Sequence, residues 1–82
     1  MAASFSEITD ILREILQDPA LEVEPATRFD ELADWNSMDL VAAVVEAECR
    51  FDVQFDLPEI DRLITVGDLL RMVVEKQALA AA

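Results

Sequence analysis

Apolar residues recur at helical spacing in three separate stretches of the chain, and this pattern limits the fold more than any other feature. The stripes lie within residues 5–16, 40–51 and 66–74, and each repeats every three or four residues, as one face of an α-helix does. Alanine, leucine, glutamate and aspartate dominate the composition while glycine occurs once, which favours helix over sheet. At 82 residues the chain has room for one core and one domain, residues 1–82. The sequence therefore predicts an all-α fold with helices at about 4–17, 37–50, 58–63 and 65–77, and a frayed alanine tail after Gln77.

The segment between the first two helices is long for so small a domain. It runs from Pro19 to Asn36, contains two prolines and shows no sustained period. A connection of this length is either functional or packed down by its own side chains. The residues available for packing are Leu21, Val23, Phe29, Leu32 and Trp35. We expect a single helical turn around Phe29 to Leu32, and Trp35 is either an anchor of this loop on the core or a substrate contact.

Charge narrows the range of partners. Eighteen carboxylates against six basic residues give a net charge of −12, which excludes nucleic acid as a natural partner and disfavours anionic membranes. The acidity either steers the chain toward basic protein surfaces or only keeps it soluble. The first ten residues lack the basic and apolar regions of a signal peptide, and the longest apolar run is six residues. We therefore expect a cytoplasmic protein without membrane insertion.

The residue types present in the chain exclude most kinds of catalytic chemistry. Histidine and tyrosine are absent and Cys49 is the sole cysteine, so the usual pairs of nucleophile and base are not available. The segment from Asp52 spaces oxygen ligands like a calcium loop, but an EF-hand needs glycine at its sixth place and glutamate at its twelfth. Leu57 and Leu63 stand there. The sequence therefore predicts neither an enzyme nor a metal site.

Ser37 stands at the entrance of the second helix, where serine often serves only as the cap. The residue three places after it is Leu40, however, so a capping box on Ser37 has no acidic partner. A cap at Asn36 places Asp39 at the third helical position and makes a better reciprocal pair. Ser37 is then the first helical residue, with an exposed hydroxyl beside backbone N–H groups that favour a phosphate.

The stretch around Ser37, "DWNSMDLVAAVVEAECRFDV", resembles the modification site and recognition helix of acyl and peptidyl carrier proteins. The resemblance extends over almost the whole chain, through the long first loop to "ITVGDLLRMV" at the last helix. It implies a four-helix bundle of the acyl carrier type. It also implies that a phosphopantetheinyl transferase moves 4′-phosphopantetheine from coenzyme A onto Ser37, and that the thiol of this arm carries acyl or aminoacyl thioesters between enzymes. Met38 takes the place of the large aliphatic residue, and Asn36 stands where the family usually has aspartate.

A second surface is predicted beside Ser37. The partner-binding residues expected there are Met38, Asp39, Ala42, Val45, Glu46 and Cys49. Four of them form an apolar stripe that faces away from the core, which is either a docking face or a set of small residues covered by the first loop. Arg50 stands where relatives often carry a carboxylate, so we expect it to repel strongly basic enzyme entrances.

The function predicted from the sequence is that of a monomeric carrier in a lipid or secondary-metabolite pathway. Its partners would be the transferase and acyl-handling or adenylating enzymes with basic docking surfaces. The alternative is an unmodified helical adaptor that keeps the carrier fold and acts as a protein-interaction module.

Overall fold

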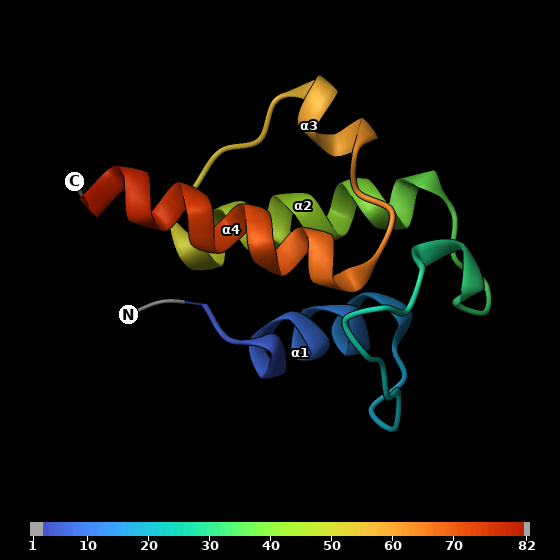
Figure 1. Ribbon diagram of the computed structural model, residues 1–82. Helices are drawn as coiled ribbons and strands as arrows, with labels where there is room; N and C mark the ends of the chain where they lie inside the picture. Colours follow the sequence, from blue (N-terminus) through green and yellow to red (C-terminus); the bar gives the residue numbers. More distant parts are fainter. Residues whose placement is uncertain (1–2, 82) are drawn as a thin grey trace.

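The computed structural model describes residues 3–81, and these form a small helical bundle (Figure 1). The helices are α1 (Phe5–Leu16), α2 (Ser37–Phe51), α3 (Leu57–Asp61) and α4 (Val66–Ala81), with a 3₁₀ turn, η1, at Phe29–Glu31. Helices α1, α2 and α4 pack against one another, while the short α3 lies to one side of them in the connection from α2 to α4. The prediction of an all-α bundle with a long first loop is confirmed.

The core lies between the three longer helices. Its fully or almost fully buried side chains come from all three, namely Ile8, Ile11, Leu12, Ala43, Val44, Ala47, Phe51, Val66, Leu69 and Val73. Two residues at the ends of the predicted stripes are not buried in the core. On α2, Leu40, the first residue of the 40–51 stripe, is only half-buried, whereas Ala43 is buried. On α4, Val74 is 36 % exposed, because one residue turns a helix by about 100° and Val73 already faces the core.

The first loop is packed onto the bundle, which is one of the two alternatives left open by the sequence. Its backbone bonds to the α3–α4 connection and the start of α4, from Phe29 N to Ile64 O (3.0 Å) and from Val66 N to Thr27 O (2.9 Å). The chain's single glycine, Gly67, lies in this contact, where its N–H donates to Pro25 O at 2.9 Å. A Cβ at position 67 would lie 2.8 Å from that carbonyl oxygen, so the close approach of the loop requires glycine.

Side chains hold the loop as well. Phe29 is buried, and its ring stacks on that of Trp35 with 5.1 Å between centroids. Both residues pack against the core cluster. The role of Trp35 as a loop anchor and the turn near Phe29 are therefore confirmed.

The two last helices begin and end at slightly different residues from those predicted. Helix α3 starts at Leu57, capped by Asp56, and ends at Asp61, so that Leu63 lies beyond it and is buried in the core. Helix α4 continues to Ala81, and the predicted end at Gln77 was wrong. Alanine is the strongest helix former, which accounts for a last turn that continues without core contacts. Ala82 lies outside the described residues.

Candidate functional site

The entrance of α2 is built around Asn36. Its side-chain oxygen Oδ1 accepts hydrogen bonds from the backbone N–H groups of Met38 (2.8 Å) and Asp39 (3.1 Å). In return, Asp39 Oδ2 accepts from the backbone N–H of Asn36 at 3.0 Å. This reciprocal box confirms the sequence interpretation that Asn36, and not Ser37, is the cap of α2.

Ser37 is consequently the first residue of α2 and its side chain is exposed. Within residues 3–81 its hydroxyl makes no hydrogen bond. The backbone N–H groups of the first helical turn give this end of the 15-residue helix a partial positive charge. An exposed hydroxyl at such a position can be esterified by a phosphate without any loss of helix capping.

A shallow hollow of about 400 Å³ opens beside Ser37. Its apolar lining comes from the first loop, α2 and the α3–α4 connection, namely Phe29, Trp35, Leu40, Leu63 and Ile64. Arg28 and Asp30 also line it, and the Arg28 guanidinium bonds both oxygens of Asp30, at 3.1 and 2.8 Å. This carboxylate raises the pKa of Arg28 above its ordinary value. A flexible arm attached at Ser37 would therefore meet an apolar surface and the Arg28–Asp30 ion pair.

The outer face of α2 is apolar next to Ser37. Met38 is 75 % exposed and Val45 is 50 % exposed, and Ala42 and Cys49 are exposed as well. The first loop does not cover them. Val41, at 47 % exposure, belongs to the same face. Sequence reasoning missed Val41, although its spacing of three from Met38 and four from Val45 was a sufficient signal.

The carboxylates of α2 are engaged within the molecule. Asp39 belongs to the cap, and Glu48 Oε2 accepts the backbone N–H of Phe55 at 2.8 Å. Glu46 Oε1 lies 3.2 Å from the Arg50 guanidinium, which also reaches Glu14 Oε2 on α1 at 3.4 Å. Arg50 is thus paired with two carboxylates in the free protein, and its repulsion of basic enzyme entrances stays a prediction.

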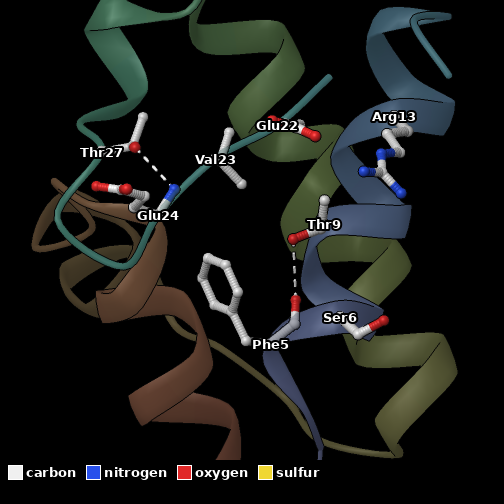
Figure 2. A pocket seen from close by; sticks show the side chains of 8 residues that line it. All are labelled: Phe5, Ser6, Thr9, Arg13, Glu22, Val23, Glu24 and Thr27. Atoms are coloured by element: carbon white, nitrogen blue, oxygen red, sulfur yellow. Dashed lines mark hydrogen bonds between the residues drawn. The ribbon is translucent and has the colours of Figure 1, made fainter. Parts of the chain in front are cut away.

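A larger hollow of about 620 Å³ lies elsewhere, between α1 and the first loop (Figure 2). The polar groups that line it are mostly bonded to one another or to nearby backbone. The Thr9 hydroxyl donates to Phe5 O at 3.1 Å, and the Thr27 hydroxyl accepts from Glu24 N at 2.9 Å. Arg13 Nε donates to the backbone oxygen of Leu21 at 2.8 Å. None of the predicted site residues lines this hollow.

The part of the chain that the structure describes has neither a cluster of metal ligands nor a membrane-spanning helix. Within residues 3–81, Cys, Asp and Glu side chains form no group of three or more that could hold a metal ion. Over the same residues, each helix is too short or too polar to cross a membrane.

Comparison with known proteins identifies the family. The family model described as a phosphopantetheine attachment site matches residues 6–73. An acyl carrier protein of Streptococcus thermophilus is 42 % identical over 74 residues, which are 90 % of this chain and 96 % of the relative. One from Acidothermus cellulolyticus is 38 % identical over 72 residues, covering 83 % and 86 % of the two chains.

Solved structures of acyl carrier proteins have the same fold as this chain. The solution structure of a holo acyl carrier protein from Geobacter metallireducens superposes with a TM-score of 0.85 at 26 % identity, covering 94 % of this chain and 88 % of that one. The acetyl actinorhodin acyl carrier protein of Streptomyces coelicolor shares the fold, with a TM-score of 0.82 at 18 % identity over 98 % and 96 % of the two chains. The resemblance inferred from the sequence is confirmed: this chain belongs to the acyl carrier proteins within the phosphopantetheine-attachment family and functions as a carrier.

Proposed function

We propose that Ser37 is the attachment residue and that its Oγ carries 4′-phosphopantetheine in a phosphodiester. The observation that supports this proposal is that two adjacent residues at the start of α2 have different roles. Asn36 holds the helix, while the adjacent Ser37 hydroxyl is exposed and makes no hydrogen bond within the described residues. Ser6, another exposed serine of the described chain, lies in α1, outside the stretch around Ser37 that resembles the modification site of carrier proteins.

The attachment needs an outside enzyme, because the chain has no histidine or other evident base beside Ser37. A phosphopantetheinyl transferase would take the proton of the Ser37 hydroxyl. The oxygen would then attack the pantetheine-side phosphorus of coenzyme A, with 3′,5′-ADP as the leaving group. The positive end of α2 favours the phosphodiester anion that results. The terminal thiol of the arm then binds acyl groups as thioesters.

In this role the chain catalyses nothing itself and presents its cargo to separate enzymes. These would be acyl-handling or adenylating enzymes of a lipid or secondary-metabolite pathway, working with a monomeric carrier in the cytoplasm. The net charge of −12 supports fast encounter with enzymes whose entrances are basic.

The alternative function, an unmodified adaptor, is supported by one feature, the asparagine before Ser37 in place of the usual aspartate. Asn36 accepts the same backbone hydrogen bonds that an aspartate cap would accept. The fold of the entrance therefore does not depend on the carboxylate, and only recognition by the transferase is in question.

Intact-mass spectrometry separates the two functions. The purified apo-protein is incubated with coenzyme A, Mg²⁺ and a transferase of broad specificity, and the mass is measured before and after. The carrier function predicts a gain of one phosphopantetheine, and thiol-specific labelling of the new terminus serves as a control for the arm. An unchanged mass with several transferases would favour the adaptor.

A further inference from the structure

We propose that an ion pair between α3 and α4 controls the position of α3, and through it the shape of the hollow beside Ser37. The pair joins Lys76 to Glu59, and Lys76 is the single lysine of the chain. Its Nζ donates to both carboxylate oxygens of Glu59, at 2.8 and 2.7 Å. The proposal concerns the free protein, and it does not depend on the attachment at Ser37.

The ammonium group of Lys76 makes a second contact beside the ion pair. Its Nζ lies 5.0 Å from the centroid of the Phe55 ring, in the segment that leads into α3, and a cation over an aromatic ring is attracted to it. Glu59 Oε1 also accepts the backbone N–H of Asp56 at 3.0 Å, so the carboxylate that Lys76 binds belongs to the cap of α3. One side chain of α4 therefore contacts both α3 and the segment before it.

The ion pair is partly shielded from water, whereas the helix that it holds is not. The side chains of Lys76 and Glu59 are only 21 % and 30 % exposed, which makes their attraction stronger than that of a fully solvated pair. The five residues of α3 are exposed or half-buried, and of these Ile60 packs against the core. So short a helix is not stable without tertiary contacts. The position of α3 therefore depends on Ile60 and on the ion pair.

The segment that contains α3 is fixed at its two ends. Before the helix, the Phe55 N–H donates to Glu48 Oε2 on α2 at 2.8 Å. After the helix, the Ile64 carbonyl accepts from the N–H of Phe29 at 3.0 Å. Segments with few buried apolar contacts open at a low free energy, while the packed helices stay folded. Loss of the ion pair should therefore release α3 between its two fixed ends without unfolding α1, α2 or α4.

The hollow beside Ser37 is connected to α3 through the backbone. Leu63 and Ile64 line this hollow and follow α3 directly, and the Leu63 N–H donates to the Ile60 carbonyl at 3.1 Å. A change in the last turn of α3 therefore moves the backbone that carries two lining residues. Lys76 lies in the second half of α4, about 15 Å along the helix axis from its first residue. The ion pair would thus act on the hollow from a distance.

The test compares variants of the unmodified protein by amide hydrogen exchange, measured by NMR. Lys76→Met removes the ammonium and keeps a long side chain, whereas Lys76→Arg keeps a cation that can bind both oxygens of Glu59. The matched control is Arg71→Met, because Arg71 is another cation of α4 and pairs with Asp68 and Glu75 of the same helix. The reporters in and after α3 are the amides of Ile60, Arg62 and Leu63, which bond to Asp56, Glu59 and Ile60. Amides in the middle of α1 report global unfolding.

We expect Lys76→Met to accelerate exchange at the three reporter amides by about tenfold, from loss of the ion pair and the ring contact together. Exchange in α1 should change much less, and Lys76→Arg and Arg71→Met should stay within about twofold of the wild type. Unchanged exchange in Lys76→Met, equal acceleration in Arg71→Met, or equal acceleration in α1 would overturn the proposal that this pair holds α3.

The effect on the hollow has its own measurement. Trp35 is the single tryptophan of the chain and lines the hollow, so its fluorescence reports the surroundings of this site. We expect the emission of Lys76→Met to shift to longer wavelength, as water gains access to the ring, and that of Arg71→Met to stay unchanged. The same emission in Lys76→Met and the wild type would overturn the connection between the ion pair and the hollow.

Discussion

Two helices of this protein begin near a serine, and the two serines are used differently. Ser4 is the cap of α1: its hydroxyl accepts from Glu7 N at 3.4 Å, and Glu7 Oε1 accepts from Ser4 N at 3.1 Å. Ser37 lies one position further into its helix, because Asn36 makes the equivalent bonds for α2. A serine at a helix start has a sufficient structural explanation only where no neighbour performs the capping. Ser4 therefore supports the fold by capping α1, whereas the hydroxyl of Ser37 is not used to cap α2.

The largest expected effect is the loss of loading in Ser37→Ala. The variant lacks the hydroxyl that we propose forms the phosphodiester. Transfer of phosphopantetheine should therefore fall to the background of the assay. Its melting temperature should stay within a degree or two of the wild type, because Asn36 retains both backbone bonds. Intact mass and circular dichroism measure the two properties on one sample. A marked loss of helicity would mean that Ser37 also has a structural role.

Substitution of the capping residues should instead lower the stability of the fold. Asn36→Ala and Ser4→Ala each remove a cap, and each should lower the free energy of unfolding by about 1 kcal/mol. Asn36→Ala is expected to have the larger effect, since Asn36 accepts two backbone N–H groups and Ser4 accepts one. Urea denaturation measures both. Ser4→Ala should still be loaded at the wild-type rate, and a defect in its loading would break the distinction between the two serines.

A smaller effect is expected from acid at the entrance of α4. Asp68 accepts the backbone N–H groups of Thr65 (3.0 Å) and Ile64 (3.1 Å), and these bonds hold its pKa below the ordinary value of 3.8. The hydrogen bond from Lys76 likewise lowers the pKa of Glu59 below 4.5. Both carboxyls release their protons more readily in the folded state. Their contribution is therefore complete above the ordinary values and is lost as the pH falls through them toward the lowered ones.

Urea midpoints measured at about pH 6 and about pH 3 test this expectation. The wild type should lose stability on acidification, and Asp68→Asn, which keeps the size of the side chain, should lose less over the same range. The same loss in both proteins would show that the entrance of α4 does not contribute to the pH dependence.

Much of this organisation could be predicted from the sequence because it depends on local patterns. The helices follow from apolar spacing, and the box at Asn36 follows from a pair of residues three positions apart. That Asn36 and not Ser37 caps α2 could be predicted for the same reason, since its neighbours determine which residue caps the helix. The family followed from the stretch around Ser37 together with features along almost the whole chain.

Contacts between distant segments could not be predicted. The pairing of Arg50 with Glu14 joins α2 to α1 across 36 positions of the sequence. The approach of Pro25 to Gly67 depends on the path of the whole first loop. The predicted fraying of the alanine tail after Gln77 is not observed, because alanine has a high helix propensity and α4 continues to Ala81.

The position of the phosphopantetheine arm is the most direct test of the proposal that Ser37 is the attachment residue. The protein is loaded with phosphopantetheine, digested with a protease, and fragmented by tandem mass spectrometry under conditions that keep the phosphodiester intact. The peptide that contains Trp35, Asn36 and Ser37 has a single hydroxyl side chain, so an adduct on it identifies the residue without ambiguity. We expect the whole of the added mass on Ser37. An adduct on Ser4, Ser6 or any threonine, or a protein that stays unloaded, would contradict it.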